Sequence, residues 1–139
     1  MLTASKAPAP GYKGTVSGIA VQLESGSEAA QEARGLIRRR LDEVLPATML
    51  WDLLTVVSEL VTNAVRHGDG DTVRVRLGVD ADGNVTGAVE DDGRGRVELR
   101  PIDAAGTRGL GLHIVAALAE RWWVSLDDST LVAFVLASP

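Results

Sequence analysis

The stretch Leu53–His67, LLTVVSELVTNAVRH, decides the fold of this chain because its residues are spaced as in a helix with two different faces. One face is apolar, and its residues recur every three or four positions: Leu53, Val57, Leu60 and Ala64, flanked by Leu54, Val61 and Val65. Such a stripe predicts a helix that packs on a hydrophobic core.

The other side of this helix carries a row of polar groups. Glu59, Asn63 and His67 follow one another at intervals of four, with Arg66 beside them, so they line up along the helix. A carboxylate, an amide and an imidazole in line can take up a proton, bind a hard cation and orient anionic oxygens. The row indicates metal and phosphate chemistry, whereas a solvated helix face is the alternative interpretation of this helix alone.

Length and composition bound the class of protein. The 139 residues suffice for one domain with a sizeable core, and 45% hydrophobic with 24% charged residues is typical of a soluble globule. A net charge of −5 argues against direct nucleic-acid binding, and the absence of cysteine excludes disulfides and thiol catalysis. The longest apolar run, Gly109–Ala119, is too short to span a membrane, so we expect a cytoplasmic protein without membrane contact.

The N-terminal part is expected to contain an arm, a strand and a helix. Residues 1–14, rich in Pro and Gly, predict a flexible arm, and residues 15–139 a single domain. Thr15–Glu24 is typical of an edge strand, with a loose alternation through Val16, Gly18 and Ala20 whose register slips at Val21 and Leu23. A helix is expected from Ser25–Glu28 to Pro46; its buried face would comprise Ala30, Ala33, Ile37, Leu41 and Val44.

Two strands are expected after the central helix. Thr48 is the expected cap of that helix, and Gly68-Asp69-Gly70 ends it. Alternating residues then predict strands up to Val79 and over Val85–Asp91, joined by a hairpin turn at Asp80–Asn84. Because strand residues alternate between faces, the covered face of the second strand ends on the carboxylate of Asp91.

The C-terminal third is expected to contain a loop, a helix and two strands. Arg96–Arg108 is a polar loop long enough to act as a lid, and Gly109–Arg121 resumes helical spacing. Trp122–Leu126 and Leu131–Leu136 are predicted strands, the second with Thr130 on its covered face. This order of elements predicts an α+β fold, a two-layer sandwich of a mostly antiparallel sheet with helices on one face.

Two glycine-rich motifs accompany these elements. In Asp91-Asp92-Gly93-Arg94-Gly95 a carboxylate can accept a hydrogen bond from an exocyclic amine while the glycines admit a base; an acidic turn is the alternative. In Gly106–Leu112 the start of a helix offers unpaired N–H groups to phosphates, although many helices begin near glycine.

Taken together, three motifs in one order resemble a known family. Glu59-x-x-x-Asn63 with His67, Asp91-x-Gly93-x-Gly95 and Gly109-Leu110-Gly111-Leu112 are similar to the N, G1 and G2 boxes of the Bergerat-fold (GHKL) ATPases. Within that superfamily, the chain most resembles the bacterial anti-sigma-factor serine/threonine kinases and their stand-alone ATP-binding relatives.

The resemblance implies a role for each matched residue. Glu59 would be the general base, Asn63 would bind Mg²⁺, and Arg66 and His67 would lie near the triphosphate. Asp91 would bind the adenine amine, with Thr130 beside it. The glycines Gly93 and Gly95 would admit the base, and the backbone of Gly109, Leu110, Gly111 and Leu112 would hold phosphates. Thr107 and Arg108 would also contact the nucleotide. Thr107 stands where many relatives have the first glycine of G-x-G-L-G and Arg108 follows it, which predicts a different closure of the lid over the γ-phosphate.

The implied function is regulatory. The chain would be a Mg-ATP-dependent serine/threonine kinase that acts on an anti-sigma antagonist, binds a sigma factor and forms a homodimer through its first strand and helix. The alternative is an ATP-binding interaction module with little turnover, which the Thr107-Arg108 pair favours. A sensor histidine kinase is disfavoured, because His67 and His113 both lie inside the motifs.

Overall fold

An antiparallel sheet and three helices form the part of the chain that the computed structural model describes, residues 15–68, 70–92, 110–126 and 128–139. The strands are β1 (Thr15–Glu24), β2 (Thr72–Asp80), β3 (Val85–Asp91), β4 (Arg121–Ser125) and β5 (Thr130–Leu136). The helices are α1 (Ala29–Leu41), α2 (Ala47–His67) and α3 (Leu110–Leu118).

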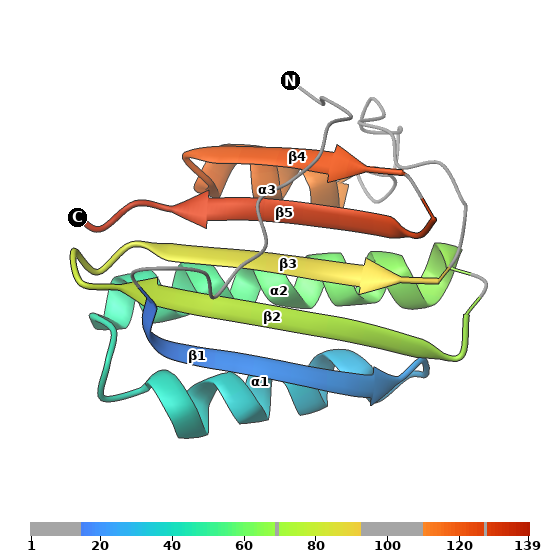
Figure 1. Ribbon diagram of the computed structural model, residues 1–139, viewed down its shortest axis with the longest axis horizontal. Helices are drawn as coiled ribbons and strands as arrows, with labels where there is room; N and C mark the ends of the chain where they lie inside the picture. The colour runs from blue at the N-terminus through green and yellow to red at the C-terminus, as the bar shows by residue number, and fades with distance from the viewer. Residues whose placement is uncertain (1–14, 69, 93–109, 127) are drawn as a thin grey trace.

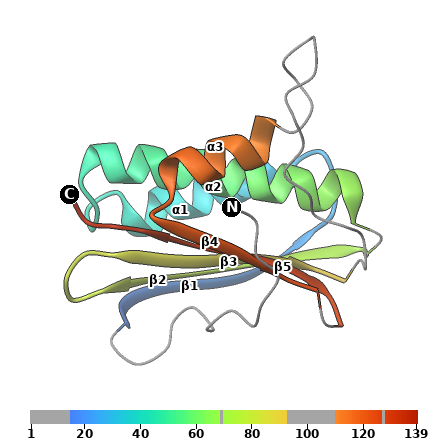
Figure 2. The same cartoon turned by 90° about the horizontal axis from the view of Figure 1, so that it is seen from above.

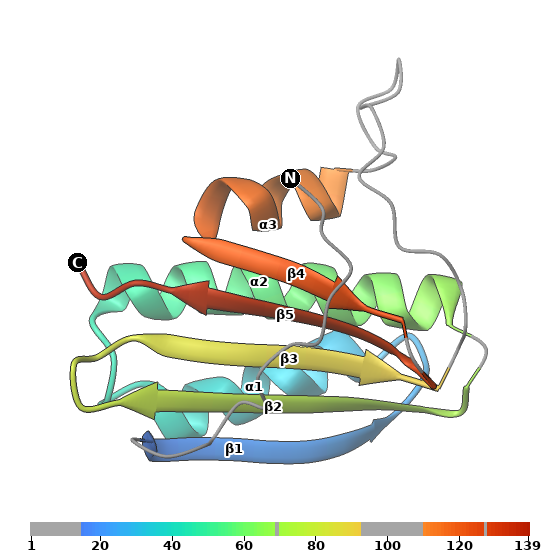
Figure 3. The same ribbon diagram turned by 45° about the horizontal axis from the view of Figure 1, so that its top comes forward.

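The elements are arranged in two layers. The sheet has the strand order β1-β2-β3-β5-β4, and each neighbouring pair is antiparallel (Figure 1). All three helices cover the same face of this sheet, as the view from above shows (Figure 2). The tilted view places α1 near β1 and α3 near β4, with α2 between them (Figure 3). The predicted two-layer α+β sandwich is confirmed.

The core lies between α2 and the central strands. The alternating valines and leucine of β2, Val73, Val75, Leu77 and Val79, are each at most 3% exposed. The predicted apolar stripe of α2 packs against them, with Leu53, Val57 and Val61 fully buried. Because β2 and β3 are paired residue by residue, the covered face of β2 continues into Val85 and Val89 of β3. The predicted faces of both strands are confirmed.

The first strand lies at the sheet edge, as expected, and the structure resolves its register, which the sequence pattern left mixed. Gly18 and Ala20 are exposed, whereas Ile19 and Leu23 are buried and Val21 packs against the core. The pairing with β2 explains this difference, since Ile19 lies opposite Leu77 and Leu23 opposite Val73. Neighbours across strands share a face of the sheet.

The first helix is shorter than predicted. It ends at Leu41, because the main-chain N–H groups of both Val44 and Leu45 fold back onto the Leu41 carbonyl in a turn. Val44, predicted to be buried, is therefore 43% exposed, and Leu45 is buried in its place. At the other end Ala29 takes the core position predicted for Ala30.

Three further boundaries differ from the prediction. The N-cap of α2 is Pro46 rather than Thr48, since the Pro46 carbonyl accepts the first helical hydrogen bond, from Leu50. The helix α3 ends at Leu118 and β4 already begins at Arg121. None of the helices within the described ranges has the length and apolar character that crossing a lipid bilayer requires.

Candidate active site

The ends of three elements lie together at one end of the sandwich. The C-terminal ends of α2 and β3 lie there with the first residues of β5 (Figures 1 and 2). The antiparallel pairing of β3 and β5 dictates part of this arrangement, because the last residue of β3, Asp91, lies directly opposite the first residue of β5, Thr130. Residues far apart in the sequence therefore become neighbours at this end.

Asp91 and Thr130 are the buried polar residues of the described part of the chain. Each is 6% exposed and lies on the face of the sheet that the helices cover. Burying a carboxylate is unfavourable unless it is paired or hydrogen-bonded, and such groups gather at functional sites. The prediction that Asp91 and Thr130 lie on covered faces is confirmed, and the pair marks this strand end as a candidate binding site.

The end of α2 packs closely against Asp91. A Cβ atom built on Gly68 would lie 3.0 Å from both Cγ and Oδ1 of Asp91, and 2.5 Å from the carbonyl oxygen of Ala64. The separation from the Ala64 backbone is shorter than real Cβ atoms show, and those from Asp91 are tight, so glycine is the residue that fits at this position without a shift. Gly68 therefore joins the first motif to the second. Sequence reasoning treated this glycine only as the end of a helix, because its contact with Asp91 depends on the tertiary fold.

The polar row of α2 leads to the same place. Glu59 and Asn63 are half-buried on one side of the helix, while Arg66 and His67 are exposed in its last turn, next to Gly68. Helix α3 packs against α2 and buries Leu112, the last residue of the predicted third box. The first and third motifs thus belong to neighbouring helices.

Part of the predicted site lies outside the described residues. This applies to Gly93 and Gly95, to the lid residues Thr107 and Arg108, and to Gly109. The first two residues of α3, Leu110 and Gly111, are helical, but their surroundings are likewise outside the description. Phosphate binding by the backbone at the start of α3 therefore stays a prediction.

The side-chain oxygens of Asn63 and Glu59 on α2 are of the kind that bind a magnesium ion carried by a nucleotide. Within the described ranges, no three His, Asp or Glu residues are grouped so that they could hold a metal ion on their own. Mg²⁺ bound to nucleotides takes one or two protein oxygens, and phosphates and water supply the remaining ligands. The half-buried amide of Asn63 and carboxylate of Glu59 fit that pattern.

Comparison with known proteins gives a family and a fold. Residues 20–134 match the family described as histidine kinase-like ATPase domain. The crystal structure of the RsbU and RsbW domains of Rv1364c from Mycobacterium tuberculosis is similar, with a TM-score of 0.68 and 24% identity over 95% of this chain and 33% of that chain. No curated protein matches significantly.

A second solved structure has the same fold. The histidine kinase domain of the blue-light activated histidine kinase EL346 from Erythrobacter litoralis has a TM-score of 0.52 and 23% identity, over 92% of this chain and 65% of that chain. The chain thus spans less than two thirds of either structure, and both likenesses concern the fold. The family match covers most of the chain and includes all three motifs and Thr130. The chain therefore belongs to the family of histidine kinase-like ATPase domains.

Proposed function

We propose that this chain binds Mg-ATP at the end of the sandwich and transfers the γ-phosphoryl group to a serine or threonine of a protein, an anti-sigma antagonist. The observation that carries the proposal is the buried Asp91, which lies opposite Thr130 and is packed against Gly68. Membership of an ATPase domain family supports ATP as the ligand. The substrate class rests on the resemblance of the three motifs to the anti-sigma-factor kinases.

Asp91 would recognise the adenine ring. Its carboxylate accepts a hydrogen bond from the 6-amino group, and hydrogen bonds to a charged acceptor are stronger than those between neutral groups. Thr130, directly across from it, offers a hydroxyl at the same level of the sheet. Burial of both residues keeps water from competing for these bonds.

Glu59 and Asn63 would serve the triphosphate end. The substrate hydroxyl oxygen forms a bond to the γ-phosphorus, the bond to the bridging oxygen of ADP breaks, and the Glu59 carboxylate takes the hydroxyl proton. A magnesium ion held by Asn63 neutralises phosphate charge when it is bound. Both side chains are half-buried two and one turns from the end of α2, on the same side of the helix.

Replacing Glu59 tests this assignment. Glu59→Gln keeps the shape of the side chain but removes the base, so phosphoryl transfer from labelled ATP is expected to fall by about 100-fold or more while the Kd for Mg-ATP changes little. Asp52→Asn, two turns earlier on the same side of α2, is the matched control and should keep full transfer. Undiminished transfer by the Gln variant would show that Glu59 is not the base.

The second candidate function is an ATP-binding interaction module with little turnover. The observation in its favour is the Thr107-Arg108 pair, which departs from the glycine usual at the lid of the related kinases. Incubation with labelled ATP and a candidate antagonist separates the two functions. A kinase labels the antagonist in proportion to time, whereas a pure binding module leaves it unlabelled at any time.

The protein partners are proposed to include a second copy of this chain. Among the described residues, no strand pairs with the outer edge of β1. Ser25 donates its main-chain N–H to the Asp71 carbonyl on the β2 side, and main-chain groups alternate in direction along a strand. The main-chain groups of Gly18, Ala20 and Gln22 therefore point away from β2. An antiparallel second β1 would satisfy them and extend the sheet.

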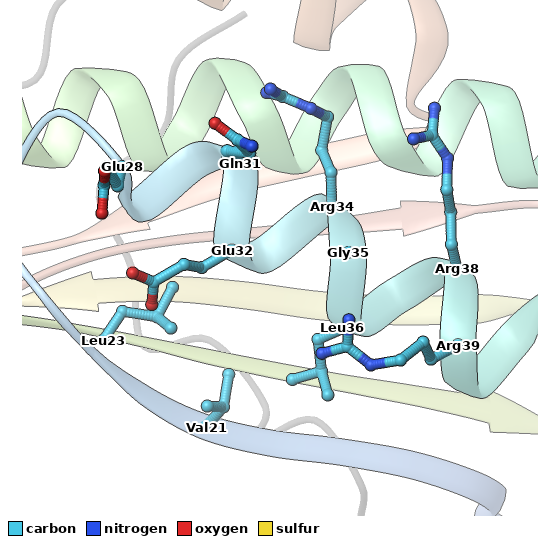
Figure 4. Close-up of a pocket in the computed structure, with 10 residues that line it drawn as sticks. All are labelled: Val21, Leu23, Glu28, Gln31, Glu32, Arg34, Gly35, Leu36, Arg38 and Arg39. Atoms are coloured by element: carbon cyan, nitrogen blue, oxygen red, sulfur yellow. The ribbon is translucent and has the colours of Figure 1, made fainter.

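A groove of about 790 Å³ between α1 and β1 supports this pairing (Figure 4). Its floor is apolar, with Val21 and Leu23 from the strand. In the close-up, Glu32 and Arg39 point from α1 toward β1, whereas Arg34 points toward α2, where it donates to Ser58 at 3.1 Å. In a two-fold arrangement of antiparallel α1 helices, Glu32 of each copy would lie near Arg39 of the other.

Charge reversal tests this dimer. Glu32→Arg and Arg39→Glu should each weaken self-association in sedimentation equilibrium, because each variant places like charges opposite one another. The double variant should restore it. A wild-type protein that stays monomeric, or single variants that associate like the wild type, would contradict the dimer without affecting the ATP site.

A further inference from the structure

An arginine on the reverse face of the sheet holds the two acidic residues that flank Asp91. The Nε atom of Arg74 in β2 donates to Oε1 of Glu90 at 3.1 Å, and its Nη2 atom donates to Oδ1 of Asp92 at 3.0 Å. Arg74 and Glu90 are direct cross-strand partners. One guanidinium group therefore fixes the residue before and the residue after the carboxylate at the candidate site.

The same network reaches the residue that precedes Thr130. The second oxygen of Glu90, Oε2, accepts a hydrogen bond from Oγ of Ser129 at 2.5 Å. Ser129 comes immediately before β5, whose first residue, Thr130, lies opposite Asp91. The side chains of Arg74, Glu90, Asp92 and Ser129, which we call the Arg74 brace, thus tie β2, β3 and the start of β5 together.

The brace and the candidate site lie on opposite faces of the same strand ends. Successive residues of a strand point to opposite faces, so Glu90 and Ser129 project away from the face on which Asp91 and Thr130 are buried. The brace therefore does not contact a ligand beside Asp91. Any effect on that ligand passes through the backbone that carries Asp91 and Thr130.

A simple contribution to sheet stability is the competing explanation. The side chain of Arg74 is 32% exposed, that of Glu90 27% and that of Asp92 55%, and ion pairs at this exposure contribute little to stability. Two features favour a local role instead. The network crosses three chain segments, and it does so where β3 ends and β5 begins, a place at which the backbone ladder stops supporting the strands.

The guanidinium group of Arg74 keeps its charge over the ordinary pH range. The hydrogen bond to Asp92, the largest cause, raises the pKa of Arg74 above its usual value together with Glu90, although partial burial opposes the shift. The guanidinium group is therefore always a cation. The N–H donors of the guanidinium group lie in one plane and can bind two carboxylates at once in a fixed geometry. A lysine ammonium group binds two carboxylates in a less fixed geometry.

We propose that the Arg74 brace is a positioning device for adenine recognition: it holds Asp91 and Thr130 in the register that lets their side chains meet the base. This inference rests on the proposed ATP-binding function. Binding groups need support from residues behind them, because a displacement well below 1 Å already weakens a directional hydrogen bond. Arg74, Glu90 and Ser129 are thus positioning residues of the site.

The test compares two nucleotides on wild-type protein and on Arg74→Met. Purine riboside triphosphate differs from ATP only in lacking the 6-amino group, so the ratio of its Kd to that of ATP reports the hydrogen bond to Asp91. Wild type should prefer ATP by about tenfold or more. The variant should lose most of that preference, with weaker ATP binding and less than about a twofold change for the amine-free analogue.

Arg76→Met is the matched control. Arg76 lies on the same strand and face, two cross-strand pairs further from the site, opposite Ala88. It should keep the wild-type preference. If Arg74 only stabilised the fold, both nucleotides would bind to Arg74→Met more weakly by the same factor. That result would contradict the positioning role of the brace. The same preference in Arg74→Met as in wild type would also overturn it.

Milder variants keep the test decisive if Arg74→Met does not fold. Ser129→Ala removes the contact to one oxygen of Glu90, and Arg74→Lys keeps the charge without the planar guanidinium donors. Each should reduce the preference for ATP part of the way, at unchanged thermal unfolding. If the wild type itself shows no preference, the proposed adenine contact of Asp91 fails and the brace fails with it. If the wild type shows the preference and all three variants keep it, the brace alone fails.

Discussion

The two ends of the β2–β3 hairpin use the same residue types for different purposes. At the turn end, Asp80, Gly83 and Asn84 link the strands; at the open end, Asp91 and Gly68 lie side by side. The carboxylate at the turn is satisfied by its own neighbours, since Oδ1 of Asp80 accepts the N–H groups of Asp82 at 2.9 Å and of Asn84 at 3.0 Å. The carboxylate at the open end is buried against a helix that comes from another part of the sequence.

This difference separates a structural acid from a candidate binding acid. The contacts of Asp80 are formed within four residues, and Gly83 adopts the positive φ of 85° that such a turn needs. The contact of Asp91 with Gly68 and its pairing with Thr130 join segments 23 and 39 residues away in the sequence. Residue type does not distinguish Asp80 from Asp91. Their burial and the sequence separation of the residues that they contact do.

The largest expected effect is that of Gly68→Ala. Its Cβ would lie 2.5 Å from the Ala64 carbonyl oxygen, which belongs to helix backbone and cannot move aside, and 3.0 Å from the Asp91 carboxylate. We expect loss of more than about tenfold in Mg-ATP affinity by calorimetry, together with destabilisation of about 1–3 kcal/mol.

Gly26→Ala is the control for this substitution, since a Cβ at Gly26 has no neighbouring atom within 4 Å. It should bind Mg-ATP as the wild type does. If Gly68→Ala also binds with wild-type affinity, the close packing of α2 on Asp91 is not part of the site.

Gly87→Ala, in the middle of the hairpin, should affect stability alone. A Cβ there would lie 2.3 Å from Cζ of Phe134 and 2.7 Å from Cδ2 of Leu77, so the core must shift to admit it. The free energy of unfolding in urea is expected to fall by about 1–3 kcal/mol. At a temperature where the variant is folded, its nucleotide affinity should equal that of the wild type. A selective loss of affinity would mean that the middle of β3 is coupled to the site.

The smallest expected effect is that of Asp80→Ala at the turn. The main-chain N–H of Asn84, the largest cause, lowers the pKa of Asp80 below its usual value of 3.8. A carboxylate with a lowered pKa stabilises the folded state above its unfolded-state pKa and loses that effect as the pH falls through the folded-state value. The melting temperature of the variant should therefore lie slightly below that of wild type at pH 7.

Acid is expected to remove this difference. The two melting temperatures should converge only at a pH below 3.8, where Asp80 of the wild type becomes protonated. A difference that is constant with pH would mean that the turn does not depend on the charge of Asp80.

Much of this fold is predictable because its signals are periodic. The alternating residues of β2 and β3 and the stripe of α2 identify their covered faces, and β3 carries that face to Asp91. The register of the edge strand stayed mixed in the sequence, because Gly18 and Ala20 are too small to reveal their exposure by type while Val21 and Leu23 break the alternation. Pairing with β2 decides the register of such a strand, and pairing is not visible in one segment of sequence.

The candidate site likewise contains residues that the sequence predicts and residues that it does not. Asp91 and Thr130 were predicted from strand alternation, and their burial confirms that part. Gly68 and Arg74 were missed as parts of the site, since one looks like any helix end and the other like a solvated strand residue. Their importance lies in contacts with Asp91, Glu90 and Asp92 across the fold. Helix ends such as Pro46 were misplaced because the local turn decides them.

The most direct test is a calorimetric titration of Mg-ATP into wild type, Asp91→Asn and Asp80→Asn, which alter the two ends of one hairpin by the same chemical change. Asp91→Asn is expected to lose affinity by about tenfold or more, because the charged acceptor at the base is removed, whereas Asp80→Asn should bind as the wild type does. Equal affinity of all three proteins, or an equal loss in both variants, would contradict a nucleotide site at the open end of the hairpin.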